Sequence, residues 1–375
     1  MQPLKGITVI DFSTLLPGPL ASLVLAEAGA EVIKVERPGG EAMRALGTPF
    51  GESSVEFVLL NRGKRSIELD LKSAGARQRL TPLIARADVL IEQFRPGVMQ
   101  SLGLGYDALK ESNPKLIYCA LTGYGQSGPK SGAAGHDLNY LAETGMLRIG
   151  ADAKGDPVVP PALIADIGGG AYPVVINVLL ALRQREIEGR GCFLDIAMTD
   201  HLFPFQYWAQ GMREATGQTP KPGAELLTGG SPRYQLYRTF DRKFLAAAPL
   251  EQRFWDNFCA AIELDPQLRR DRDDPEATRA AVAAIIETRT ASEWMQVFGN
   301  IDACVSVVAD IGEAMRNPQF AGRGLFSHRV GDEYKVLTAA AVPLSPQFRA
   351  APATVTAPAL GEANEEYLIA SKEER

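Results

Sequence analysis

Three side chains have the types and surroundings expected of acid–base catalysis: His136, Asp166 and Glu251. His136 follows residues 123–134, a run of turn-forming composition, and precedes a helical pattern. This order predicts that His136 lies at or near a helix N-terminus. The partial positive charge at that end of a helix favours the neutral imidazole, so His136 is a candidate general base. A histidine with a purely structural role is the alternative.

Asp166 ends an apolar run and stands just before the glycines at 168–170. A carboxyl group here can exchange a proton with a ligand, and glycines allow a ligand to approach the backbone closely. Asp166 can equally be only the N-cap of the helix that follows. Glu251 begins a helix predicted over residues 251–262, where an acidic side chain suits the helix dipole, so it is either a catalytic group or a cap.

Basic residues form a cluster in the first part of the chain. They are Lys34, Arg37, Arg62, Lys64, Arg65, Lys72 and Arg95. Arginine binds phosphate through a bidentate fork and lysine through a point charge. Arg37, Lys72 and Arg95 each come directly after a predicted strand, so these three are the better candidates for an anionic ligand. The chain has no dinucleotide fingerprint and no phosphate-binding loop ending in Gly-Lys-Ser/Thr.

The elements that must position these groups alternate between strand and helix in the first 120 residues. Strands are predicted over residues 6–12, 31–36, 66–71, 89–94 and 116–121, with helices over 17–30 and 73–87. This alternation predicts an α/β fold with a parallel sheet, whose ligands bind at the carboxyl ends of the strands.

The middle of the chain has a different pattern. It predicts a helix over residues 169–188, a strand over 192–197, a looser segment over 211–232 and a strand over 304–309. A hairpin is predicted over 234–248, with its turn at Asp241-Arg242.

Composition excludes several classes of protein. The net charge of −6 argues against a general nucleic-acid binder, and the longest apolar run, residues 172–182, is too short to span a membrane. The four cysteines lie far apart, which predicts neither a zinc site nor a disulfide framework and fits a reducing cytoplasm. Cys119 and Cys304 lie in strand-like runs and are expected to be buried. His328 lies in a polar stretch and is expected to be exposed.

Five separated segments resemble the class III CoA-transferase (CaiB/BaiF-type) superfamily. They are residues 16–40, 89–109, 116–129, 160–182 and 302–320. Within that superfamily the chain looks most like α-methylacyl-CoA racemases. Their Gly-His-Asp segment, Asp followed by glycines, and Glu at the head of a small-domain helix are matched here by His136, Asp166 and Glu251. The chain departs from them at Arg242, where a glycine is usual.

The resemblance implies a doubly wound, mostly parallel sheet in a large domain and a smaller α+β domain. The large domain would span residues 1–197 and 320–375, the linker 198–233 and the small domain 234–319. Two chains would form an interlocked homodimer. The substrate would be an acyl-CoA thioester, without a metal, a redox cofactor, a nucleic acid or a membrane as partner, and the enzyme would be cytoplasmic.

By the same resemblance, CoA and the thioester would contact two groups of residues. They are Arg37, Leu69, Asp70, Leu71, Lys72, Gln93, Phe94 and Arg95, and then Gly135, Asp137, Asn139 and Tyr140. The implied reaction is racemisation of 2-methylacyl-CoA thioesters, with His136, oriented by Glu251, on one face of the carbon and Asp166 on the other. Two alternatives remain. One is CoA transfer between carboxylic acids through an aspartyl-CoA thioester at Asp166, and the other is a CoA-ester binding protein without catalysis.

Overall fold

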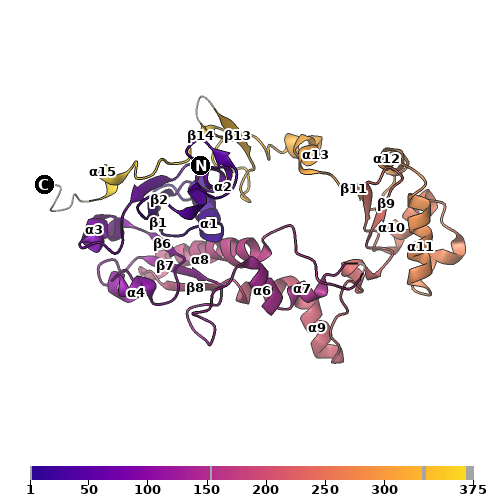
Figure 1. Ribbon diagram of the computed structural model, residues 1–375, viewed down its shortest axis with the longest axis horizontal. Coiled ribbons are helices and arrows are strands. Elements are labelled where there is room, and N and C mark those ends of the chain that lie inside the picture. Colours follow the sequence, from indigo (N-terminus) through magenta and orange to yellow (C-terminus); the bar gives the residue numbers. More distant parts are fainter. Residues whose placement is uncertain (1, 153, 332–334, 369–375) are drawn as a thin grey trace. The chain divides into compact units, whose positions relative to one another are not determined.

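The computed structural model describes residues 2–152, 154–331 and 335–368, which group into two units (Figure 1). Unit 1 comprises Met1–Leu141, Pro161–Pro204 and Pro318–Arg375. Unit 2 comprises Ala142–Pro160 and Phe205–Asn317. Residues 142–160, assigned above to the large domain, therefore group with unit 2.

Unit 1 contains a six-stranded sheet in which all neighbouring strands are parallel. Its strands are β1 (Thr8–Asp11), β2 (Glu31–Glu36), β5 (Arg65–Glu68), β6 (Val89–Glu92), β7 (Ile117–Thr122) and β8 (Phe193–Ala197). Their order in space is β5-β2-β1-β6-β7-β8. The order of strands reverses between β1 and β6, and such a switch point is where doubly wound sheets bind ligands. The predicted α/β class and the large parallel sheet are confirmed.

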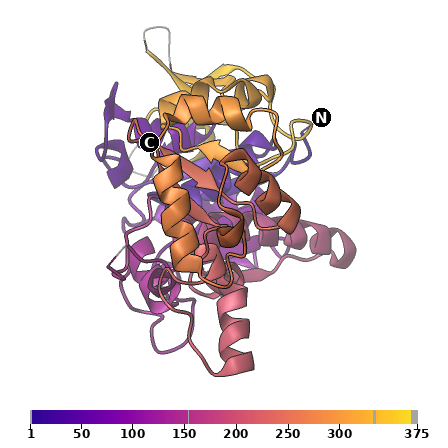
Figure 2. The same cartoon turned by 90° about the vertical axis from the view of Figure 1, so that its right-hand side faces the viewer.

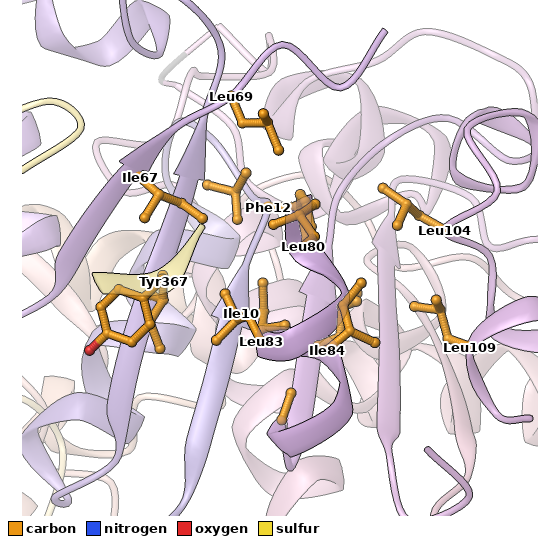
Figure 3. Packing of buried hydrophobic residues seen from close by; sticks show 14 of the residues in the cluster. Ile10, Phe12, Ile67, Leu69, Leu80, Leu83, Ile84, Leu104, Leu109 and Tyr367 are labelled. Atoms are coloured by element: carbon orange, nitrogen blue, oxygen red, sulfur yellow. The ribbon is translucent and has the colours of Figure 1, made fainter. Parts of the chain in front are cut away.

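Helices pack against this sheet because their apolar residues recur every three or four positions. In α3 (Ala76–Arg86), Leu80, Leu83 and Ile84 are buried and meet Ile10 of β1 (Figure 3). Each such buried side chain contributes about 1.5–3 kcal/mol of hydrophobic free energy. The helices α1 (Pro17–Glu27) and α8 (Tyr172–Glu188) pack against each other within the same unit.

The helix that includes Asp166 starts earlier than predicted. A π-helical turn, η2 (Ala165–Ala171), runs directly into α8, where the sequence predicted a start at residue 169. Together they make a helix, Ala165–Glu188, that is long and apolar enough to cross a membrane by length and composition. The expectation that no apolar segment reaches this length was therefore wrong. Half of the helix's most apolar window is buried inside the protein.

The C-terminal part of the chain adds a small sheet to unit 1. It contains β13 (Val336–Ala339), β12 (His328–Gly331) and β14 (Thr354–Val355), in that order. The prediction that His328 is exposed was wrong, since its exposed fraction is only 3%. Exposed and buried residues alternate along β12, so His328 and Val330 both face inward. Tyr367 of α15 (Asn364–Tyr367) joins the core beside Ile67 (Figure 3).

Unit 2 has its own antiparallel sheet of β9 (Gln235–Arg238), β10 (Phe244–Ala247) and β11 (Val305–Val307). The predicted hairpin is confirmed, and Arg242 adopts the left-handed φ of 63° that usually favours glycine. The helices α10 (Gln252–Ala261), α11 (Pro275–Ile286) and α12 (Ala291–Phe298) belong to the same unit (orange in Figure 2). Its core contains Trp255, Phe258 and Trp294.

Two expectations about the middle of the chain need correction. The helix α9 (Tyr207–Thr216) covers the start of the segment expected to be loose from residue 211. Cys304 is exposed rather than buried, because it lies just before β11 with a left-handed φ of 51°.

The remaining elements are short. They are η1 (Ala42–Arg44), β3 (Pro49–Phe50), β4 (Ser53–Ser54), α2 (Val55–Asn61), α4 (Val98–Ser101), α5 (Tyr106–Leu109), α6 (Asp137–Glu143), α7 (Met146–Ile149), η3 (Asp200–Gln206), η4 (Leu226–Gly230), η5 (Pro266–Arg269), α13 (Ile311–Arg316) and α14 (Pro318–Gly322).

Candidate active site

A cleft of about 400 Å³, here called the main cleft, opens in unit 1 at the carboxyl ends of β6 and β7. His136 and Asp166 both line it, although 30 positions separate them in the chain. Six other predicted site residues share the wall: Gln93, Phe94, Arg95, Gly135, Asn139 and Tyr140. The structure thus brings two of the three acid–base candidates together at the switch point of the sheet.

His136 is the residue directly before α6, as the sequence predicts. Its backbone N–H donates to Oδ1 of Asn139 at 3.0 Å, and its carbonyl oxygen accepts from the backbone N–H of Asn139 at 2.8 Å. These two bonds fix the start of the helix. The imidazole is exposed and lines the cleft, where it can exchange a proton with a bound molecule.

Asp166 lies at the second position of η2, and its side chain does not cap the helix. The cap comes from Asp137 of α6, whose Oδ1 accepts from the backbone N–H groups of Ala165 at 2.6 Å and Asp166 at 3.0 Å. Burial, and then the negative charge of Asp137, raise the pKa of Asp166 to about 6, although the nearby His136 acts in the opposite direction. A carboxyl group with this pKa can both take and return a proton near neutral pH.

The glycines after Asp166 serve packing more than ligand access. A Cβ on Gly169 would lie 2.5 Å from the carbonyl oxygen of Met198, and one on Gly170 would lie 3.1 Å from Cβ of Pro17. Glycine therefore lets η2 approach both α1 and the segment after β8. This close approach brings Asp166 to the same cleft wall as Met198.

A second cavity, of about 390 Å³, adjoins the main cleft, because Leu15 and Phe94 line both. Of the residues predicted to bind CoA, six line it: Arg37, Leu69, Asp70, Leu71, Lys72 and Phe94. Apolar side chains such as Phe12 and Val35 complete the wall. Such a wall suits a flat ring system, and the two cations suit phosphate groups beside it.

The basic cluster divides into structural and available residues. Lys34, Arg62 and Lys64 are buried in ion pairs with Glu41, Glu27 and Asp11, and Arg65 pairs with Glu362 and Glu366 at the surface. Arg37, Lys72 and Arg95 are exposed and make no ion pair with any residue that the structure describes. These are the three that follow strands.

Sequence reasoning missed the buried charges that hold the loop after β1. Asp11 is fully buried and accepts hydrogen bonds from the backbone N–H and the hydroxyl of Ser13. Burial alone would raise its pKa, but Lys64 and Lys34 lower the pKa of Asp11 to about 2. Lys34 also pairs with Glu41, whose Oε2 accepts from the backbone N–H of Leu15 at 3.0 Å. This contact supports Leu15 at a φ of 63°, which is unusual for leucine. Leu15 is part of the wall that the two cavities share.

Glu251 belongs to unit 2. It is the N-cap residue of α10 but makes no side-chain capping bond, so its exposed carboxylate is available to another group. Arg233 holds both of its neighbours in the chain, the carbonyl oxygen of Leu250 at 3.3 Å and Oε1 of Gln252 at 2.9 Å. The pairing of Glu251 with His136 stays a prediction.

Comparison with known proteins gives the wider context. The family model for CoA-transferase family III matches residues 4–364. The chain is 37% identical to the mouse alpha-methylacyl-CoA racemase over 97% of this chain and 92% of that protein. It is 32% identical to the acetyl-CoA:oxalate CoA-transferase of Acetobacter aceti, over 86% of this chain and 85% of that one. The solved structure of Rv3272 from Mycobacterium tuberculosis superposes with a TM-score of 0.83 and 31% identity, covering 98% of this chain and 99% of that one.

Proposed function

This chain belongs to CoA-transferase family III, and we propose that within the family it is a racemase of 2-methylacyl-CoA thioesters. The observation that carries the proposal is that His136 and Asp166 line one cleft. Inversion of a carbon centre needs two groups that exchange protons, one for each face. The similarity to the mouse racemase over nearly the whole chain supports the same reading.

The proposed reaction is proton transfer at the carbon next to the thioester carbonyl. One of the two residues, as a neutral imidazole or a carboxylate, removes the proton and leaves an enolate, with the electron pair delocalised onto the thioester oxygen. The other residue, in its protonated form, returns a proton to the opposite face. Backbone N–H groups in the first turn of α6 suit the enolate oxygen, and each such donor can stabilise it by about 3 kcal/mol.

The CoA part of the substrate would bind in the second cavity. Arg37 and Lys72 would contact its phosphates, and the strand-end residues Leu69, Asp70 and Leu71 would line the nucleotide. The pantetheine arm would then pass Phe94 and Leu15 into the main cleft, where Gln93, Arg95, Gly135, Asn139 and Tyr140 lie. Since proton transfer of this kind is acid–base chemistry, we expect no metal or redox cofactor, and we place the enzyme in the cytoplasm.

We further propose a homodimer in which Glu251 of one copy orients His136 of the other. The carboxylate of Glu251 is exposed and makes no capping hydrogen bond, which supports this role. The helix α8 leaves Ile176, Leu180 and Ile187 exposed, and a second copy would cover these apolar side chains.

A deuterium experiment tests the reaction. A single epimer of a 2-methylacyl-CoA is incubated with the enzyme in heavy water, and deuterium uptake at carbon 2 and stereochemical purity are followed together. We expect both label and loss of purity. Retained configuration with no label would exclude the racemase.

The second candidate is CoA transfer between carboxylic acids. It is favoured by the similarity to the acetyl-CoA:oxalate CoA-transferase. Asp166 would attack the thioester carbonyl and release CoA as a thiolate. The thiolate would then attack the resulting anhydride at the aspartyl carbonyl, giving an aspartyl-CoA thioester and the free acid. Hydroxylamine would label Asp166 in this case only.

A further inference from the structure

Asp137 connects the two candidate bases. It is the neighbour of His136 in the chain and the first residue of α6. Its side chain points away from solvent, with an exposed fraction of 7%, and bonds to the backbone of the segment that includes Asp166.

The two hydrogen bonds converge on a single oxygen. Oδ1 of Asp137 accepts from the backbone N–H of Ala165 at 2.6 Å and from that of Asp166 at 3.0 Å. These are charge-assisted bonds, which are stronger than those of neutral acceptors. They also satisfy N–H groups that the first turn of a helix cannot pair internally.

We propose that Asp137 is a positioning residue that sets where Asp166 stands relative to His136. The family resemblance implied that Asp137 contacts the ligand, whereas both hydrogen bonds of its carboxylate come from protein backbone. This inference rests on the proposed racemase, because only a reaction with two proton carriers depends on the spacing of these two side chains. The role of Asp137 has a geometric part and an electrostatic part.

The geometric part comes from sequence adjacency. A movement of α6 carries His136 and Asp137 together, and the bonds from Asp137 carry the backbone of Asp166 with them. The two proton carriers therefore keep one spacing. A misplacement of about 1 Å between reacting groups can reduce the rate by about 100-fold.

The electrostatic part comes from the charge of Asp137 beside a second, mostly buried carboxyl group. A like charge disfavours ionisation of Asp166, and burial acts in the same direction. With its pKa raised to about 6, Asp166 is mostly ionised at neutral pH but can take up a proton at little cost, as an acid–base role requires.

Two substitutions separate these parts. Asp137→Asn keeps an oxygen that accepts both N–H bonds but removes the charge. It should keep kcat within about threefold at the pH optimum and move the low-pH limb of the pH–rate profile down by about half a pH unit or more. Asp137→Ala removes both bonds and should lower kcat about 100-fold with KM nearly unchanged.

A measurement without turnover separates this inference from the proposed function. Carbon-13 NMR of labelled aspartate, assigned with Asp166→Asn, follows the titration of Asp166 directly. We expect a midpoint near 6 in the wild type and a lower one in Asp137→Asn. Backbone amide exchange at residues 165 and 166 should be slow in both and fast in Asp137→Ala.

Each outcome has one meaning. If the titration of Asp166 and the amide exchange at residues 165 and 166 change as expected but no 2-methylacyl-CoA is epimerised, Asp137 positions Asp166 and the proposed function is wrong. If epimerisation occurs but Asp137→Asn leaves the titration of Asp166 and the pH limb in place, the electrostatic part is overturned. If Asp137→Ala also leaves kcat and amide exchange unchanged, the geometric part is overturned too.

Asp107, an exposed first-turn carboxylate of α5, is the control, and its Asn and Ala variants should match the wild type. If Asp137→Ala fails to fold, the titration and pH profile of Asp137→Asn still decide.

Discussion

Replacing Asp166 with Asn should abolish the proposed chemistry and, at the same time, stabilise the protein at neutral pH. The Asp166 carboxyl group is mostly buried, and its surroundings raise its pKa from 3.8 to about 6. At 1.36 kcal/mol for each pH unit, this rise corresponds to at most about 3 kcal/mol of destabilisation by the ionised form. Because part of the group reaches solvent, we expect a net effect of about 1–2 kcal/mol. The neutral amide of asparagine carries no such cost.

The sign of the pH dependence follows from linkage. A carboxyl group whose pKa is higher in the folded than in the unfolded chain binds its proton more tightly in the folded state. The Asp166 carboxyl group therefore contributes fully to stability below pH 3.8, and this contribution is lost as the pH rises through about 6. The wild type should therefore approach the variant in stability as the solution becomes acidic.

Calorimetric unfolding of both proteins at about pH 7.5 and about pH 4 measures this difference. At the neutral pH the Asp166→Asn variant should unfold at a higher temperature than the wild type. At the acidic pH the unfolding temperatures of the two proteins should nearly coincide. Asp107→Asn, at an exposed carboxylate that pairs with Lys110, should not show this stabilisation at neutral pH. An Asp166→Asn protein that is less stable than the wild type at neutral pH, or a difference that does not change with pH, would refute the reasoning.

Three further predictions concern the surroundings of the site. Lys64→Met should lower the free energy of unfolding by about 3–5 kcal/mol, because the buried carboxylate of Asp11 loses its ion-pair partner; a loss below about 1 kcal/mol in chemical denaturation would contradict this. Arg37→Ala should raise KM for the CoA ester about tenfold with kcat unchanged, and an unchanged KM would remove Arg37 from nucleotide binding. His136→Ala and Glu251→Ala should each be nearly inactive, but their co-expressed mixture should recover about one quarter of wild-type activity, since half of the dimers are mixed and each has one intact site. Absence of recovery would argue against a site shared between copies.

The sheet of unit 1 was predictable because its strands have strong local patterns. β2 contains Val32, Ile33 and Val35, and β6 begins with three apolar residues, Val89 to Ile91, as expected of strands that are buried on both faces. The same reasoning located Arg37, Lys72 and Arg95, since parallel strands end at one edge of the sheet. A position directly after a strand therefore predicted which basic residues are available to a ligand better than charge did. Lys34 and Lys64 have the same charge but are buried.

Contacts between distant segments were not predictable from local pattern. The sequence near Asp166 allowed a helix cap, but the cap is Asp137, which lies 29 positions away. Cys304 and His328 were assigned the wrong exposure for a related reason. A strand-like run around Cys304 does not show where the turn before the strand falls, and polar neighbours of His328 do not show which face of β12 is covered.

The choice between the two proposed reactions depends on the group beside Asp166. A carboxylate with a pKa of about 6 is ionised at neutral pH and can attack a thioester, but it can also carry a proton at little cost. Nucleophilic attack requires no second proton carrier, whereas inversion of a carbon centre does. His136 is near enough for its charge to affect Asp166, and it lines the same cleft. His136→Ala should therefore end epimerisation but spare any CoA transfer, and the loss of both activities together would show that the histidine does not discriminate between them.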